Sequence, residues 1–337
     1  MPDQNTVFIP LAHEARFKPH FNLVESSGGQ IEIVDLDNAD ARKSVLSKAV
    51  AGAIGLDQFD AADFEIATHL KAIITCTTGV DPIDLAAATS HGVMIGNTPD
   101  LCVEEVADHT MMLLLACYRR IPRLITNSQG KAPHRDHVIT PSEKWPRLRG
   151  QVAGLLGLGN IAQAVAQRCK PFGLHVIAHD PFVDPDLATR LQVELVELNH
   201  LLERSDYLSL HAPLNPSTHH LINQAAFEQM QPTAFLINAS RGPLIDEPSL
   251  VKALETNQIA GAALDVLEVE PPEERNPLLT LPNAFVTPHT AGYSSDARAW
   301  GPESAVRDAV EVLNGGRPRS IQNPEVLGLV KSISTGE

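Results

Sequence analysis

Three polar side chains, each placed just beyond a short apolar run, could transfer a hydride to or from a small acid. Arg241 precedes a glycine, Glu270 precedes a proline, and His289 follows a proline. A guanidinium fork binds a carboxylate and polarises a neighbouring carbonyl. A carboxylate beside an imidazole stabilises the protonated ring, which can then give a proton to a carbonyl oxygen while hydride reaches its carbon. Asp265 is a second acid nearby, predicted to contact the nicotinamide end of a cofactor.

Each of these residues also has a structural interpretation. A surface arginine at a strand end is ordinary, and a lone histidine is more often structural than catalytic. The presence of Glu270 just beyond another predicted strand is what favours catalysis by His289. The other histidines, including His109, His175 and the His219-His220 pair, are interpreted as structural. None has the spacing of a metal ligand, so no metal site is predicted.

A glycine-rich turn upstream predicts a dinucleotide site. In Gly157-Leu-Gly159-Asn-Ile-Ala162, Gly157 allows a tight strand-to-helix turn, Gly159 lets the backbone approach a pyrophosphate, and Ala162 packs the helix closely. Such a turn alone is weak evidence, but Asp180 follows 18 residues after Ala162, at the end of the next apolar run. Its carboxylate suits ribose hydroxyls and repels a 2′-phosphate, so NAD is favoured over NADP.

Short apolar runs alternate with helical patterns in two stretches of the chain. The first predicts strands at 7–9, 31–34, 53–54, 72–75 and 93–95, and helices at 41–50, 61–70 and 83–90. The second predicts six strands, at 152–156, 175–178, 207–210, 234–237, 262–264 and 285–286. Continuous apolar strands separated by helices indicate parallel sheets covered on both faces. The fold class is therefore α/β, with doubly wound sheets.

The segments between and after these stretches complete the expected organisation. A buried helix is expected over 104–120, an extended loop over 126–148, and a final helical pattern from 293 to 313 that Pro302 interrupts. We expect residues 1–100 and 293–337 to form a substrate-binding and catalytic domain. Residues 101–292 are expected to form an inserted Rossmann domain for NAD.

Composition restricts the class of protein. The chain has 337 residues, 43% of them hydrophobic and 20% charged, with a formal net charge of −15. That acidic balance, without a basic stripe, disfavours direct nucleic-acid binding. No apolar stretch is long enough to span a bilayer, and no signal peptide is visible. Four scattered cysteines without a C-x-x-C pair suit buried thiols in a cytoplasmic protein.

Taken together and in this order, the motifs resemble the D-isomer-specific 2-hydroxyacid dehydrogenase family. The resemblance runs from about residue 72 to 316 and is densest from 150 to 292. It implies a flavodoxin-like substrate domain beside the Rossmann domain, and a homodimer formed through the NAD domain. It also implies interconversion of a small 2-oxo acid and a D-2-hydroxy acid.

The resemblance assigns roles residue by residue. Arg241 would bind substrate, His289 would be the acid/base, and Glu270 would hold and tune His289. Substrate would further meet Thr78, Gly79 and Val80, whose turn could also form an anion nest. The NAD site would be lined by Gly157, Leu158, Gly159, Asn160, Ile161, Asp180, His211, Ala212, Pro213, Ala239, Arg241, Asp265 and His289.

Other functions on the same scaffold stay open at this point. Residues 103–108, 118–120 and 281–283 are similar to the C-terminal-binding-protein branch, whose corepressors sense NAD(H), but Gly292 stands where those carry a tryptophan. Formate dehydrogenases place glutamine at the position of Glu270, and phosphite dehydrogenases place a lysine in the loop matching 77–79. Both are disfavoured here. The absence of Arg or Lys from 55–59 and 76–79 disfavours a phosphorylated substrate.

Overall fold

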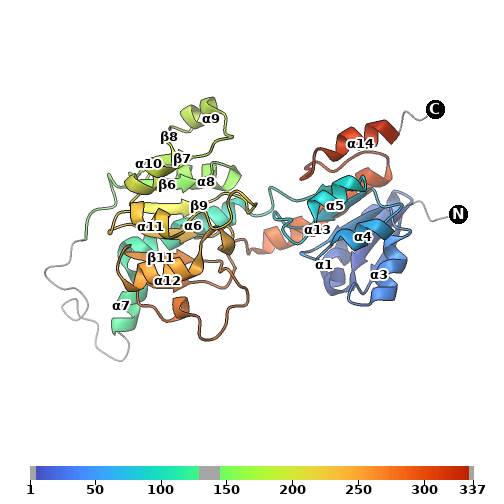
Figure 1. Cartoon of the computed structure of the whole chain (residues 1–337). Coiled ribbons are helices and arrows are strands. Elements are labelled where there is room, and N and C mark those ends of the chain that lie inside the picture. Colours follow the sequence, from blue (N-terminus) through green and yellow to red (C-terminus); the bar gives the residue numbers. More distant parts are fainter. Residues whose placement is uncertain (1–4, 129–144, 334–337) are drawn as a thin grey trace. The chain divides into compact units, whose positions relative to one another are not determined.

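The computed structural model describes residues 5–128 and 145–333, and the chain divides into two compact units. The outer unit contains Met1–Cys102 and Tyr293–Glu337, and the inserted unit contains Val103–Gly292 (Figure 1). The functional roles expected for the two units stay predictions. Within the described ranges, no helix is both long and apolar enough to cross a membrane.

The outer unit is built on a five-stranded parallel sheet in the order β2-β1-β3-β4-β5. This strand order is the flavodoxin-like one, as the resemblance implied. Its strands are β1 Thr6–Pro10, β2 Gln30–Val34, β3 Ala51–Ile54, β4 Ala72–Thr75 and β5 Met94–Gly96. Its helices are α1 Glu14–Phe17, α2 Phe21–Ser26, α3 Ala39–Leu46, α4 Ala61–Ile66, α5 Leu85–Ser90, α13 Ser295–Leu313 and α14 Val326–Ile333.

Both faces of this sheet are buried, because successive residues of a strand point to opposite sides. In β1, Val7 and Ile9 belong to a core shared with α13, whereas Phe8 belongs to a core shared with α3 and α4. The C-terminal segment thus returns to complete the unit that the first hundred residues begin. Helices α3, α4 and α5 cover one face, and α1, α2 and α13 cover the other.

The inserted unit is built on a seven-stranded parallel sheet in the order β12-β11-β10-β9-β6-β7-β8. Counted within the unit, this is the Rossmann order 3-2-1-4-5-6 with one further strand. Its strands are β6 Val152–Leu156, β7 His175–His179, β8 Glu194–Leu195, β9 Tyr207–Leu210, β10 Phe235–Asn238, β11 Gly261–Leu264 and β12 Ala284–Val286. The predicted α/β fold with two doubly wound sheets is confirmed.

Helices cover both faces of the second sheet. They are α6 Val103–Arg119, α7 Ile121–Ser128, α8 Asn160–Cys169, α9 Pro185–Arg190, α10 Leu198–Arg204, α11 Gln224–Gln229 and α12 Glu247–Glu255. The core on one face combines residues of α10, α11 and α12, and the other combines residues of α6, α8 and α9. In β10, Leu236 faces the first core and Ile237 the second.

Besides the unpredicted helices α1 and α2 and shifted helix ends, the structure differs from the sequence-based expectations in three ways. Strand β8 is a seventh strand, missed because its two residues are exposed at the sheet edge and form no apolar run. The expectation was that Pro302 would kink or split the last helix, and it does not split α13, because the core burial of Ala305, Val306 and Ala309 outweighs the hydrogen bond that a proline cannot donate. Residues 126–128 of the expected loop belong to α7, and 129–144 lie outside the described residues.

The parallel register determines where functional side chains can gather. Asn238 at the end of β10 pairs with Leu264 at the end of β11, which pairs with Val286 at the end of β12. The loops that follow these strands therefore leave one edge of the sheet side by side. Arg241, Glu270 and His289 all lie in these loops, so the topology brings their backbones to a common place.

Candidate active site

Gly157 makes the turn between β6 and α8, and its backbone requires glycine. Its φ is +92°, a left-handed conformation that L side chains rarely adopt. A Cβ there would lie 3.0 Å from the backbone nitrogen of Ala212, and the Gly157 N–H donates to the carbonyl of His179 at 2.9 Å. The turn is therefore packed tightly between the ends of β7 and β9.

The start of α8 is suited to a phosphate. The residue preceding the helix is Gly159, which has no side chain to accept hydrogen bonds from the first helical N–H groups. Open N–H groups at a helix N-terminus, together with the helix dipole, favour an anion such as a pyrophosphate. Ala162 is fully buried against the sheet, as predicted for the third small residue of the turn. These features fit a dinucleotide.

Asp180 is held in place by the turn that it follows. One carboxylate oxygen accepts a hydrogen bond from the Leu158 N–H at 2.8 Å, and the other accepts one from the Phe182 N–H at 2.9 Å. Each oxygen keeps a lone pair for a ribose hydroxyl. The Leu158 side chain is buried in the core, so the prediction that Leu158 lines the cofactor site can hold only for its backbone.

The segment after β9 lies between the glycine turn and the catalytic loops. His211 Nε2 lies 2.9 Å from the Ser209 hydroxyl, and desolvation by burial lowers the pKa of His211 to about 4. The ring is therefore neutral at pH 7. Ala212 packs against Gly157 on one side, and its carbonyl accepts a hydrogen bond from the Ser240 hydroxyl at 2.9 Å on the other.

The loop that carries Arg241 is held by its own polar residues and by a close backbone contact. The Asn238 side-chain amide donates to the Arg241 carbonyl at 2.9 Å, and the Ser240 N–H donates to the Asn238 side chain at 3.0 Å. The next residue, Gly242, approaches the following loop so closely that a Cβ would lie 1.9 Å from the Leu267 carbonyl oxygen. Glycine is thus required for the Arg241 loop to lie against the Glu270 loop.

Glu270 and His289 form a pair, as the sequence predicted. His289 Nδ1 lies 2.6 Å from one carboxylate oxygen of Glu270, and the other oxygen accepts the Leu267 N–H at 2.9 Å. His289 has a φ of +52°, a conformation uncommon for a residue other than glycine. With Nδ1 taken by Glu270, the ring presents Nε2 as the atom able to exchange a proton. Arg241 Nη1 donates to the Ser240 carbonyl at 2.8 Å.

Asp265 anchors the loop that carries His289. Its side chain is 1% exposed and accepts hydrogen bonds from the Thr287 hydroxyl at 2.5 Å, the Thr290 N–H at 3.0 Å and the Ala291 N–H at 2.7 Å. These donors flank His289 on both sides. The contacts give Asp265 a positioning role, whereas its direct contact with a cofactor stays a prediction.

His109 contacts the same group of residues, and these contacts are compatible with its interpretation as a structural histidine. Its Nε2 lies 3.0 Å from the Thr287 hydroxyl and 3.3 Å from an Asp265 carboxylate oxygen. His109 lies on α6, far from both partners in sequence. A polar side chain just before the apolar Met111–Leu115 run was the only signal in the sequence, and that signal named no partner.

Thr78, Gly79 and Val80 follow β4 in the outer unit. The Thr78 hydroxyl donates to the Thr98 carbonyl at 3.3 Å, and the Thr78 carbonyl accepts from the Asn97 amide at 2.6 Å. The turn is therefore tied to the end of β5. Its predicted role in binding substrate together with Arg241 stays a prediction.

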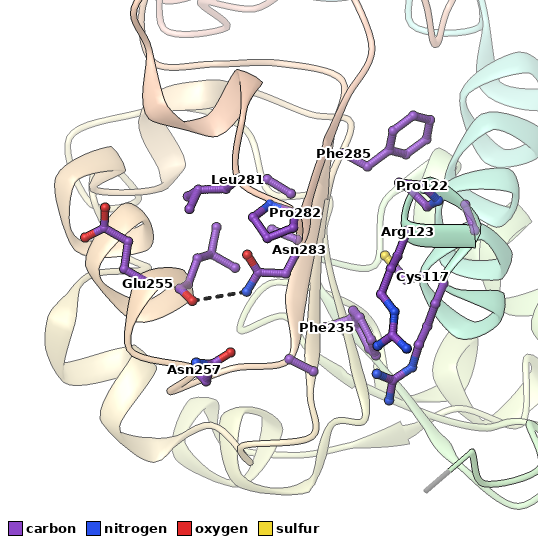
Figure 2. A pocket seen from close by; sticks show the side chains of 16 residues that line it. Cys117, Pro122, Arg123, Phe235, Glu255, Asn257, Leu281, Pro282, Asn283 and Phe285 are labelled. Carbon is purple, nitrogen blue, oxygen red and sulfur yellow. Dashed lines mark hydrogen bonds between the residues drawn. The ribbon is translucent and has the colours of Figure 1, made fainter. Parts of the chain in front are cut away.

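A cavity of about 500 Å³ lies elsewhere in the inserted unit (Figure 2). It is lined by the first residues of β10 and β12, Phe235 and Ala284, by Arg120 just after α6, and by Arg123 of α7. These strand beginnings mark the amino edge of the sheet, opposite the loops that carry Arg241, Glu270 and His289. The cavity therefore contains none of the predicted site residues.

Known proteins resemble this chain over most of its length. The family model for the "D-isomer specific 2-hydroxyacid dehydrogenase, NAD binding domain" matches residues 111–291. A glyoxylate reductase from Thermofilum pendens is 39% identical over 275 residues, which cover 80% of each protein. The crystal structure of a glyoxylate reductase from Paecilomyes thermophila superposes with a TM-score of 0.84 at 25% identity, covering 96% of this chain and 99% of that one.

A second kind of relative has a longer chain. A D-3-phosphoglycerate dehydrogenase from Methanocaldococcus jannaschii is 38% identical over 260 residues, which cover 77% of this chain but 48% of that protein. This chain thus aligns with about half of that relative. The names of the relatives differ in substrate, and none of these likenesses tests the similarity to the C-terminal-binding-protein branch.

Proposed function

The chain belongs to the D-isomer-specific 2-hydroxyacid dehydrogenase family, and we propose that it reduces a small 2-oxo acid to the D-2-hydroxy acid and catalyses the reverse reaction. The family makes it an NAD-dependent oxidoreductase of 2-hydroxy acids. The observation that carries the proposal for this chain is the 2.6 Å contact between His289 Nδ1 and Glu270. A binding protein without chemistry has no need of this pair.

Three side chains of the inserted unit would catalyse this reaction. The Arg241 guanidinium binds the substrate carboxylate and polarises the adjacent carbonyl. His289 delivers a proton from Nε2 to the carbonyl oxygen, and in the reverse direction takes it back. Glu270 holds the ring by Nδ1 and stabilises its protonated form before the transfer. NADH, when bound, supplies the hydride that reaches the carbonyl carbon.

The glycine turn supports binding of the cofactor. The open N–H groups at the start of α8 would meet the pyrophosphate, and Asp180 would accept hydrogen bonds from ribose hydroxyls. We propose NAD rather than NADP, because a 2′-phosphate would meet the Asp180 carboxylate and no arginine lies between 180 and 186. His211, Pro213 and Ala239 stay predicted members of the site.

We propose glyoxylate, hydroxypyruvate or a modest apolar 2-oxo acid as substrate. One relative is named a glyoxylate reductase. Asp57 in the outer unit accepts the Gly55 N–H at 2.9 Å and lies 3.2 Å from His13 Nε2. This negatively charged side chain just beyond β3 would repel a substrate phosphate, so we do not propose a phosphorylated substrate. Another relative is nevertheless named a D-3-phosphoglycerate dehydrogenase.

We further propose that the protein is a cytoplasmic homodimer assembled through the inserted unit. Met112 of α6 and Ile121 of α7 are 40% and 39% exposed, and the cavity of Figure 2 opens beside the same helices. Covering these apolar side chains with a second copy would remove them from water. Size-exclusion chromatography with light scattering would give the molecular mass of the wild type and of Met112→Lys. A monomeric wild type would count against this interface, and so would a Met112→Lys variant that stays dimeric.

The reaction itself is tested by following NADH consumption with glyoxylate, hydroxypyruvate, pyruvate and longer 2-oxo acids. We expect turnover that depends on His289, with NADPH used less well. Failure of every acid in this panel, with NADH binding retained, would overturn the enzyme proposal. That result would favour a protein whose partner binding responds to NAD(H).

A further inference from the structure

The loop after β11 carries two glutamates, and each meets a histidine from a different loop. Glu270 meets His289, which follows β12, and Glu268 meets His220, which lies between β9 and α11. The two distances are nearly equal: 2.6 Å for His289–Glu270 and 2.7 Å for His220 Nε2–Glu268. Both histidines adopt left-handed backbone conformations, with φ of +52° for His289 and +51° for His220. The second pair repeats the first without belonging to the proposed chemistry.

His220 also contacts the loop that carries Arg241. Its backbone N–H donates to the Pro243 carbonyl at 2.8 Å, and Ile222 then pairs with Ile245 as an isolated parallel bridge. One residue thus binds the Arg241 loop through its backbone and the Glu270 loop through its side chain. His220 Nδ1 also lies 4.0 Å from an Asp246 carboxylate oxygen.

Glu268 is held by contacts of both its side chain and its backbone. One carboxylate oxygen meets His220, and the other accepts the Glu247 N–H at 3.2 Å. The Glu268 N–H in turn donates to a Glu247 carboxylate oxygen at 3.0 Å, and Gly242 packs directly on the Leu267–Glu268 peptide. The neighbouring Leu267 N–H is the donor that holds Glu270. Displacing Glu268 would therefore move the support of Glu270.

We propose that His220 and Glu268 are a positioning pair that holds the loop carrying Glu270 against the loop carrying Arg241. The inference rests on the proposed function, because it assigns the purpose of the pair to the Arg241–Glu270–His289 site. Neither residue touches the reacting atoms. Their effect is to keep the carboxylate that holds His289 and the guanidinium that binds substrate at the separation that one substrate molecule requires.

A series at position 220 separates the side-chain contact from the backbone conformation. His220→Ala removes both the donor and the bulk. His220→Gln keeps a donor close to the position of Nε2, and His220→Asn suits a left-handed φ but is too short to reach Glu268. His200→Ala is the control, since His200 lies exposed on α10 and has no described side-chain contact. His219 is unsuitable, because its ring centroid lies 3.9 Å from that of His220.

With NADH and the best 2-oxo acid of the panel, we expect His220→Ala to lower kcat/KM on the order of 10- to 100-fold, the scale for misplaced catalytic groups. Both parameters should change while NADH affinity is kept. The kcat should fall because Glu270 is displaced, and the KM should rise because Arg241 is displaced. His220→Gln should restore most of the loss, and His220→Asn should not. Activity of His220→Ala equal to that of His200→Ala would overturn the pairing, as would rescue by Asn instead of Gln.

Hydrogen exchange gives a second readout that needs no turnover. The Leu267 and Glu268 amides donate to Glu270 and Glu247, so their protection reports the order of this loop. We expect protection to fall in His220→Ala and to stay unchanged in His200→Ala. If the wild type turns over no 2-oxo acid, the proposed function fails by itself. Unchanged protection in His220→Ala would instead overturn the positioning pair, whatever the activity.

Discussion

The glycine turn and the catalytic loops leave the same edge of one sheet, but they are held in different ways. The hydrogen bonds of the turn lie within one strand–helix–strand segment, from the Gly157 N–H to His179 and from the Leu158 N–H to Asp180. The catalytic loops are organised by contacts between segments far apart in the chain. His109 and Thr287, for example, are separated by 178 residues.

This difference means that cofactor binding and turnover should fail separately. A change in the glycine turn should weaken NADH binding and leave the Glu270–His289 pair intact. A change in the catalytic loops should lower turnover far more than NADH affinity. The segment at His211 and Ala212 touches both regions, so a change there should affect the stability they share.

The largest effect is expected at the acid/base itself. His289→Asn keeps a side chain that tolerates the left-handed φ of +52° but removes the imidazole. We expect kcat to fall by about 10²- to 10⁴-fold, the usual contribution of a general acid. NADH affinity, measured by calorimetry, should change far less. A variant that keeps wild-type turnover would show that His289 is not the proton donor.

A somewhat smaller effect is expected at Gly242. A methyl group there would meet the Leu267 carbonyl, which must then move away together with the loop that carries Glu270. We expect Gly242→Ala to lower kcat/KM by roughly 100-fold through displaced catalytic groups, with NADH affinity kept. Gly328→Ala is the control, since a Cβ at that position meets nothing within 4 Å. Equal activities of the two variants would contradict the close contact.

The glycine turn should show the opposite pattern. Gly157→Ala forces a φ of +92° on an L residue beside the Ala212 nitrogen. Backbone strain of about 1–3 kcal/mol would weaken NADH binding roughly 10-fold or more. At saturating NADH, kcat should recover. A variant with normal NADH affinity but low kcat would break the distinction between the two regions.

The smallest effect concerns the segment that joins them. The pKa of His211 is about 4 in the folded protein because burial disfavours its charged form. As pH falls below the unfolded value of about 6.5, the unfolded chain takes up the proton first, so stability is lost between pH 6.5 and 4. At pH 5.5 the free energy of unfolding should be lower by about 1 kcal/mol, which is less than the full linkage value because His211 is partly exposed. Denaturant titrations of cofactor-free protein should show a shallower decline in His211→Asn, and parallel curves would contradict the assignment.

Patterns local in sequence predicted most of the architecture. Apolar runs located eleven of the described strands because buried parallel strands contain little but apolar residues. The exception, β8, is two exposed residues whose place depends on pairing with β7. Pro302 was expected to interrupt a helix, and only the packing of the outer unit shows why α13 continues.

In the candidate site, too, some features follow from local sequence and others from tertiary contacts. The amino-acid sequence by itself determined the turn at Gly157, the acid at 180 and the three catalytic candidates, because their types and spacing already carry the chemistry. Only the tertiary structure decided that Glu270 holds His289 by Nδ1, that Gly242 packs on the next loop, and that His109 and His220 contact these loops. These contacts depend on the register that aligns the ends of β10, β11 and β12. The spacing of residues along the chain does not show which loops will lie side by side, because that depends on how the parallel strands pair.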